Sequence, residues 1–235
     1  MYLFYCPNIE SCQTLSEEES GHCVRVLRYS AGDEILITDG KGTTYTARIT
    51  NPHPKHCDFE IISREKQEPH HAFHLHLAIA PTKNIERLEW CIEKCVEIGV
   101  DEITPLLCRF SERKHLRTDR LDKIILSAAK QSLTPYLPVL HELTPFEEFI
   151  RIQNSEFRGQ KFIAHCYKED KRVLKEEIER GKDVLVLIGP EGDFSEQEVA
   201  EALAAGFIPV SLGNSRLRTE TAGVVACHTV VLMNE

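Results

Sequence analysis

Two glycine-punctuated loops in the last third of the chain carry the residue types that could do chemistry. The first is Gly189-Pro190-Glu191-Gly192-Asp193, and the second runs from Leu212 to Ala222. Each follows an apolar run and precedes a helical pattern, so both are predicted to lie at the carboxyl edge of a parallel sheet, where open α/β sheets bind ligands. Neither contains a G-x-G-x-x-G or G-K-[ST] motif, so the ligand is predicted to be neither NAD nor ATP.

The first loop favours a tight turn, and the second adds fixed cations. Residues 189–192 suit a type I turn with Pro190 at its second position. Gly213 would let a ligand approach the backbone, and Arg216 and Arg218 bring two planar guanidinium groups. A plain alternative stays open for both loops, because a strand-to-helix turn and two solvated arginines would also account for the pattern.

The start of the last helix holds two further candidates. Thr219 is predicted to cap this helix, and Glu220 would lie in its first turn, where a carboxylate is favoured by the helix dipole. Glu220 is therefore explained equally well by helix stability and by chemistry.

The elements that would position these loops form two regions. Residues 1 to about 63 read as short strands (34–38, 44–49 and 58–62) separated by turns, with a short helix after Ser16, which predicts a small barrel. Residues 64–71 are polar and charged, as in a linker. From residue 73, apolar strands alternate with helices, including a capping box from Ser195 to Glu198 and a helix that ends at Gly99. This pattern predicts a parallel α/β domain.

Composition limits the possible partners. The 235 residues are 42% hydrophobic and 28% charged, with no apolar run long enough for a membrane span and no signal-peptide pattern, so the protein is expected in the cytoplasm and without a membrane partner. The net charge of −9 argues against bulk electrostatic binding of nucleic acid, so any RNA contact needs clustered arginines.

Cysteine and histidine do not form a recognisable metal pattern. The nine cysteines include no C-x-x-C pair, and reduced buried thiols are the favoured interpretation. His70, His71, His74 and His76 invite a metal interpretation, but a half-exposed strand edge explains the alternating pair equally well. No metal site is predicted.

At this point several separated motifs, in order, resemble one family along the whole chain. Residues 189–192, the Leu212-Gly213 step and residues 217–222 closely resemble ribosomal small subunit methyltransferase E, and residues 22–28, 92–100 and 128–132 match further landmarks of it. The resemblance implies that S-adenosylmethionine is the cofactor and that N3 of a uridine in 16S ribosomal RNA, free or in the small ribosomal subunit, is methylated.

The resemblance also implies the architecture. Residues 1–70 would form a PUA-like RNA-binding β-barrel, and residues 71–235 a SPOUT methyltransferase domain with a mostly parallel sheet. In that class the C-terminal chain threads a trefoil knot, and a homodimer completes the active site. The last helix, with Val224, Val225, Cys227, His228 and Val231, carries apolar residues around its circumference, as expected if a second subunit covers one side.

The family's functional positions transfer to this chain residue by residue. Arg218, Glu220 and Arg216 become the catalytic candidates, with Arg218 stabilising charge on the uridine and Glu220 acting as base or holding Arg218. Arg25 and Arg28 become phosphate contacts, with a solvated face as the alternative. The predicted cofactor-binding residues are Ile163, His165, Leu187, Ile188, Gly189, Pro190, Glu191, Gly192, Ser211, Leu212, Gly213, Asn214, Leu217, Thr219 and Thr221.

The chain departs from the family at one step of the second loop. The family has proline, arginine and an aliphatic residue where Asn214, Ser215 and Arg216 stand, so its first arginine is missing and Arg216 occupies the aliphatic position. Whether Arg216 takes over the role of the missing arginine stays open, so Arg218 is the direct transfer from the family. Two alternative functions therefore stay open. One is a SPOUT enzyme acting on transfer RNA or large-subunit RNA, and the other is an RNA-binding ribosome assembly factor that has lost methyl transfer.

Overall fold

The structure is a computed structural model that describes residues 2–69, 71–168 and 170–235. Contacts divide the chain into two compact units, which are residues 1–69 with 126–137 and residues 70–125 with 138–235. His70, at the expected domain boundary and in the histidine cluster, lies outside the described residues.

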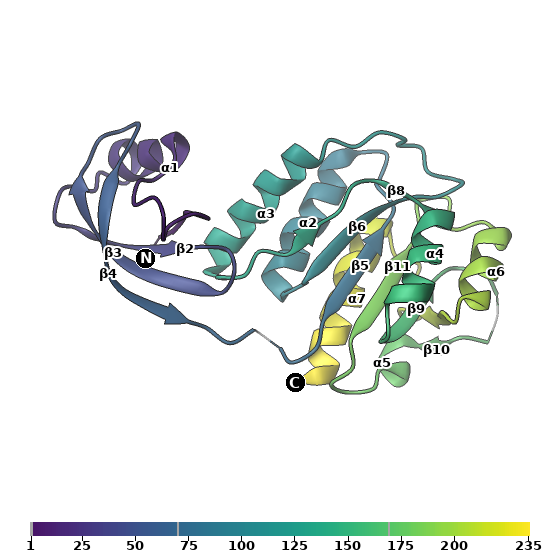
Figure 1. The fold of residues 1–235 in the computed structure, drawn as a ribbon. Helices are drawn as coiled ribbons and strands as arrows, with labels where there is room; N and C mark the ends of the chain where they lie inside the picture. The colour runs from purple at the N-terminus through teal and green to yellow at the C-terminus, as the bar shows by residue number, and fades with distance from the viewer. Residues whose placement is uncertain (1, 70, 169) are drawn as a thin grey trace. The chain divides into compact units, whose positions relative to one another are not determined.

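The first unit is built on a four-stranded sheet in the order β1-β2-β3-β4 (Figure 1). Strand β1 pairs in parallel with β2, and the other two pairs are antiparallel. The bounds are β1 Leu3–Tyr5, α1 Glu17–Gly21, the π-helical turn η1 His22–Val26, β2 Glu34–Thr38, β3 Thr43–Asn51 and β4 Asp58–Lys66. The three strands and the short helix expected from the sequence are confirmed, but β4 continues to Lys66, into the expected linker.

The C-terminal half of helix α3 (Thr118–Ser132) and the segment after it belong to this first unit. Lys130 and Glu19 form a buried ion pair at 2.5 Å, and the Thr38 hydroxyl donates to the Pro135 carbonyl. Gly42 leaves room for Tyr136, because a Cβ at Gly42 would lie 2.0 Å from the tyrosine ring.

The second unit is a parallel sheet in the order β10-β12-β9-β11-β5-β6-β7, with β8 also paired to β6. All the pairings in this sheet are parallel, as the sequence pattern predicts. The strands are β5 Leu75–Ile79, β6 Glu102–Leu107, β7 Val139–Leu140, β8 Thr144–Pro145, β9 Gln160–Ala164, β10 Arg172–Val173, β11 Val184–Ile188 and β12 Ile208–Ser211.

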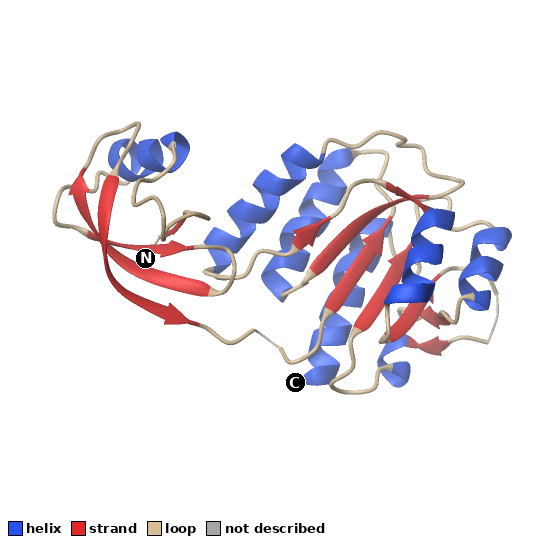
Figure 2. Ribbon diagram, in the orientation of Figure 1, coloured by secondary structure: helices blue, strands red, loops and turns tan. Residues whose placement is uncertain are grey.

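Helices cover both faces of this sheet (Figure 2). They are α2 Ile85–Ile98, α4 Phe146–Glu156, α5 Leu174–Glu177, α6 Glu196–Ala204 and α7 Thr219–Asn234. Helices α2 and α7 pack together on one face, and α4 and α6 lie on the other. Burial of apolar side chains on both faces explains why the central strand β11 is entirely apolar.

Local signals fix several helix ends as expected. Gly99 ends α2 with a left-handed φ of 104°, and Ser195 begins α6 through a complete capping box with Glu198. In α7, Gly223 allows close helix packing, because a Cβ there would lie 2.7 Å from the Cys91 Sγ.

The described residues include no helix long and apolar enough to cross a membrane. Within the same residues, no group of three or more His, Cys, Asp or Glu side chains has an arrangement that could hold a metal ion.

Candidate functional site

Three loops meet at the carboxyl edge of the large sheet. They follow β9, β11 and β12, which are neighbouring parallel strands, so residues 165–166, 189–193 and 212–218 emerge side by side. The two glycine-punctuated loops of the sequence are thus brought to one place, as expected from the strand order.

Hydrogen bonds join these loops over long stretches of sequence. Both carboxylate oxygens of Asp193 accept backbone N–H groups, one from Cys166 at 2.7 Å and one from Phe194 at 2.8 Å. Asp193 itself has a left-handed φ of 67°. The hydroxyl of Thr219, which is buried, donates to the Gly189 carbonyl at 3.1 Å and ties the third loop to the second.

Two details of the sequence prediction were wrong here. The turn within residues 189–193 is closed by a hydrogen bond from the Asp193 N–H to the Pro190 carbonyl, so it spans residues 190–193 rather than 189–192. Arg218, not Thr219, is the N-cap residue of α7, and it makes no side-chain capping bond. The Thr219 hydroxyl therefore serves the tertiary contact with Gly189 instead of the helix end.

A cavity of about 380 Å³, here called the loop cavity, lies among the three loops. This volume lies within the roughly 300–1,000 Å³ range of small-molecule sites. Its lining residues are Arg87, Ala164, Cys166, Ile188, Gly189, Pro190, Glu191, Asp193, Arg216, Leu217, Arg218, Thr219 and Ala222.

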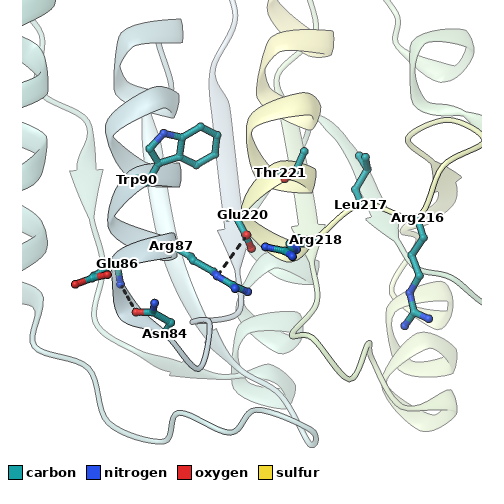
Figure 3. A pocket seen from close by; sticks show the side chains of 9 residues that line it. All are labelled: Asn84, Glu86, Arg87, Trp90, Arg216, Leu217, Arg218, Glu220 and Thr221. Atoms are coloured by element: carbon teal, nitrogen blue, oxygen red, sulfur yellow. Dashed lines mark hydrogen bonds and ion pairs between the residues drawn. The ribbon is translucent and has the colours of Figure 1, made fainter.

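A second cavity of about 630 Å³, here called the helix cavity, lies between α2 and α7 (Figure 3). It shares Arg87 and residues 216–218 with the loop cavity, so these residues form a common wall. The helix cavity is lined by Asn84, Glu86, Arg87, Trp90, Arg216, Leu217, Arg218, Glu220 and Thr221.

The charges of the common wall are only partly compensated. Arg216 and Arg218 are exposed and form no ion pair with any described residue. Glu220 is 7% exposed, and its Oε1 lies 3.8 Å from the Arg87 Nε, whereas its buried Oε2 has no hydrogen-bond partner within the described chain. Glu220 thus pairs with Arg87 rather than with Arg218, and one carboxylate oxygen is left for another group (Figure 3).

The thiol in the loop cavity is held in its neutral form. Burial, followed by the negative charge of Asp193, raises the pKa of Cys166, although the nearby Arg216 acts in the opposite direction. Cys166 therefore contributes a polar but uncharged group to the cavity at neutral pH.

Some of the predicted cofactor-binding residues line one of the two cavities, and the others line neither. The loop cavity is lined by Ile188, Gly189, Pro190, Glu191, Leu217 and Thr219, and the helix cavity by Thr221. Neither lining includes Ile163, His165, Leu187, Gly192, Ser211, Leu212, Gly213 or Asn214. Ile163 and Leu187 are fully buried strand residues, and His165 is buried with Lys171 bonded to its ring and its carbonyl.

The two glycines proposed from sequence differ in what they require. A Cβ at Gly192 would lie 3.0 Å from the Cβ of Phe110, so packing within the chain explains this glycine. Gly213 has open space around it but a φ of 128°, which side-chain-bearing residues rarely adopt, so the backbone shape explains it.

Sequence reasoning missed Arg87 and Trp90, which line the helix cavity from α2. No motif marks them, since they are two residues of an amphipathic helix whose other face is buried. The one signal available in the sequence was that Trp90 is the only tryptophan of the chain and stands in a predicted helix; the structure shows that it is 44% exposed.

In the other unit, Arg25 and Arg28 lie in and just after η1. Both are exposed, and neither forms an ion pair with any residue that the structure describes. Arg28 has a left-handed φ of 59°, and the intervening Val26 is 63% exposed, so this turn presents a basic and partly apolar surface.

Comparisons with known proteins agree with this geometry. Residues 69–231 match the RNA methyltransferase domain family, and residues 15–62 match the RNA methyltransferase PUA domain family, which confirms the PUA-like N-terminal domain. Ribosomal RNA small subunit methyltransferase E of Buchnera aphidicola is 30% identical over 228 residues, covering 93% of this chain and 87% of that protein.

Solved structures extend the likeness to the whole fold. A "probable rRNA-methyltransferase" from Porphyromonas gingivalis superimposes with a TM-score of 0.91 at 43% identity, covering 99% of both chains. Ribosomal RNA small subunit methyltransferase E from Neisseria gonorrhoeae, solved with S-adenosylmethionine bound, gives a TM-score of 0.84 at 26% identity and covers 100% of this chain and 98% of that one. Together the two domains, their order and these relatives show that the chain belongs to the ribosomal RNA small subunit methyltransferase E family of RNA methyltransferases.

Proposed function

We propose that this enzyme transfers the methyl group of S-adenosylmethionine to N3 of a uridine in 16S ribosomal RNA. Methylation of small-subunit ribosomal RNA follows from the family, and the uridine N3 is the finer part of the proposal. One observation carries the mechanism: the two cavities adjoin at Arg87 and residues 216–218, which line both, so a methyl donor in one can lie next to an acceptor base in the other.

The loop cavity suits the cofactor. Its cationic side, Arg87, Arg216 and Arg218, can pair with a carboxylate, and the tied loops offer backbone groups around Gly189 to an adenine or ribose. When bound there, S-adenosylmethionine would supply an electrophilic methyl group on a positively charged sulfur. Asp193 would act indirectly, because both its oxygens already hold the loops in place.

The helix cavity suits the uracil. Uridine N3 carries a proton at neutral pH, so methylation needs a proton acceptor and stabilisation of charge on the adjacent carbonyl oxygens. The Glu220 Oε2, buried and without a partner in the described chain, is our candidate acceptor. Arg218 brings a planar guanidinium cation with several N–H donors and is our candidate for stabilising the carbonyl oxygens. Arg87, 3.8 Å from Glu220, would position that carboxylate.

The decisive assay combines methyl-labelled S-adenosylmethionine with purified small-subunit RNA, large-subunit RNA and transfer RNA in separate reactions. We expect label only in the small-subunit RNA, on a uridine whose N3 methylation is identified by mass spectrometry of the digested RNA. Label in another RNA would support a different substrate, and no transfer to any RNA or to assembled small subunits would support an assembly factor.

We also propose that the enzyme works in the cytoplasm as a homodimer. On α7, Val225 and Val231 remain half-buried and Leu232 is 53% exposed, while the exposed Trp90 lies on the neighbouring α2. A second copy of the chain, related by a two-fold axis, would cover this surface. Sedimentation should find a dimer for the wild type and an inactive monomer for Val231→Asp. A wild-type monomer with full activity would contradict the dimer.

A further inference from the structure

The loop after β6 concentrates positive charge in an acidic protein. Residues 108–117, here called the basic loop, include four lysines and arginines against one acidic residue, whereas the whole chain has 28 Lys and Arg against 37 Asp and Glu. The members are Cys108, Arg109, Phe110, Ser111, Glu112, Arg113, Lys114, His115, Leu116 and Arg117. Since the chain repels polyanions overall, such a cluster stands out from its surroundings.

The basic loop is fixed to the loops of the candidate site. The backbone N–H of Arg109 donates to the Glu198 carboxylate at 2.7 Å, and the Phe110 Cβ lies directly over Gly192. Arg113 donates to the carbonyls of Thr82 and Lys83, at 3.1 and 2.7 Å.

The segment that Arg113 holds is itself tied to the second loop of the site. Lys83 N–H donates to the Glu191 carboxylate at 2.9 Å, and Glu191 lines the loop cavity. Groups on the basic loop therefore keep a set position relative to the loop cavity.

Some side chains of the basic loop serve its structure, and others are left for a partner. Arg117 is paired with Asp119, Glu112 with Lys83, and Arg113 with two backbone carbonyls. Arg109 and Lys114 are exposed, and their side chains have no hydrogen bond or ion pair among the described residues. Phe110 is 47% exposed, although it is a large apolar side chain.

We propose that the basic loop is a binding site for the single-stranded RNA that flanks the target nucleotide. Arg109 and Lys114 bind phosphate groups, and the exposed ring of Phe110 stacks on a base. The combination of cations with an exposed aromatic ring is the one by which proteins hold single strands without reading their sequence. This inference rests on the proposed function, because it assigns part of the substrate RNA to this surface.

The test is RNA binding by the full-length protein as a function of salt. The double variant Arg109→Ala/Lys114→Ala should bind protein-free small-subunit ribosomal RNA about tenfold more weakly and reduce the slope of log affinity against log salt by about 1.5, as expected for two lost phosphate contacts. Phe110→Leu should weaken binding by about fivefold or more without changing this slope. Affinity for S-adenosylmethionine, measured by calorimetry, should stay at the wild-type value in both variants.

The matched control is Arg180→Ala/Lys182→Ala, which removes two exposed cations next to the amino end of β11, at the opposite edge of the sheet. It should keep the wild-type RNA affinity and slope. If wild-type protein methylates the RNA while Arg109→Ala/Lys114→Ala keeps the wild-type affinity and slope, or the control loses as much, the surface is wrong and the function stands. Wild-type protein that neither binds nor methylates the RNA would overturn both.

Discussion

The carboxyl and amino ends of the strands in the large sheet differ in whether their charged side chains have partners within the protein. At the carboxyl end, Arg216 and Arg218 face cavities without any acidic partner among the described residues. In the amino-terminal half of β5 and β6, the carboxylate of Glu102 lies 2.5 Å from His141, 3.6 Å from His74 and 3.7 Å from His76. Two cations at the carboxyl end are therefore left for ligands, whereas the ionisable side chains around Glu102 at the amino end contact one another and serve the fold.

The largest effect is expected where the loop backbone is most unusual. Gly213→Val should abolish S-adenosylmethionine binding in calorimetry, because a β-branched residue at a φ of 128° forces residues 212–218 out of shape. Gly181→Val is the matched control at the amino edge of the sheet, since Gly181 also has a positive φ, 73°, and open space around it. It should bind the cofactor normally; equal losses in both variants would remove the distinction between the two ends.

The second-largest effect is expected for Arg218→Ala. If its guanidinium stabilises charge on the uracil, turnover should fall by about 100-fold or more while cofactor affinity changes less. Arg218→Lys, which keeps the charge but not the planar fork, should recover part of the loss. Single-turnover methylation of small-subunit RNA measures this, and near-normal turnover of Arg218→Ala would refute the role.

At the amino end, a substitution of His76 should change the stability of the protein and leave catalysis unchanged. Burial, with smaller contributions from the positive charges of His141 and His74, lowers the pKa of His76 to about 3, so burial outweighs the carboxylate at 3.7 Å. Unfolded chains protonate this histidine below about pH 6.5, whereas the folded protein keeps it neutral. Its stabilising contribution is therefore complete above pH 6.5 and is lost as the pH falls towards 3.

Between pH 6.5 and 5, His76 alone should lower the free energy of unfolding by about 2 kcal/mol. Urea unfolding of His76→Gln, which keeps a side chain able to hydrogen-bond with Thr104, should show a flatter pH dependence by this amount. His228→Gln, at an exposed position of α7, should follow the wild type. Parallel curves for His76→Gln and wild type would show that this end is not an acid-sensitive element.

The smallest effect is expected in the first unit, where Arg25 and Arg28 are, like Arg216 and Arg218, without an acidic partner among the described residues. Arg25→Ala/Arg28→Ala should flatten the salt dependence of RNA binding and weaken it several-fold, because both arginines are unpaired among the described residues. Arg48→Ala/Arg64→Ala, which removes two arginines already paired with glutamates, is the control in the same unit. Wild-type binding by the first variant would place the RNA elsewhere.

The sequence predicted those features of the fold that depend on residues within one helix or strand. The apolar run 184–188, the capping box at Ser195 and the stop at Gly99 each depend on neighbouring residues only, and each is confirmed. Helix α4 was missed, because it begins after Pro145 without any side-chain cap. The threaded knot stays a prediction from resemblance, since no local pattern encodes the path of a chain through a loop.

The site was predictable as a set of loops but not as a set of contacts. Strand order brings the loops after β9, β11 and β12 together, and the alternating pattern already implied it. Thr219 was expected to cap α7, yet it bonds to Gly189, thirty residues earlier, because that carbonyl is brought beside it only in the folded sheet. Arg87 had no motif, and only the packing of α2 against α7 places it between two cavities.

The hydrogen bond from Thr219 to Gly189 also has a consequence for synthesis of the chain. Both cavities need residues 216–218, and the third loop is held to the second by a residue of α7. A nascent chain can complete β5, β6, β9 and β11 well before these residues emerge, yet neither cavity exists until α7 has docked. The enzyme therefore gains its binding capacity only after α7 has been synthesised and has docked, and a chain terminated before residue 216 would have neither cavity.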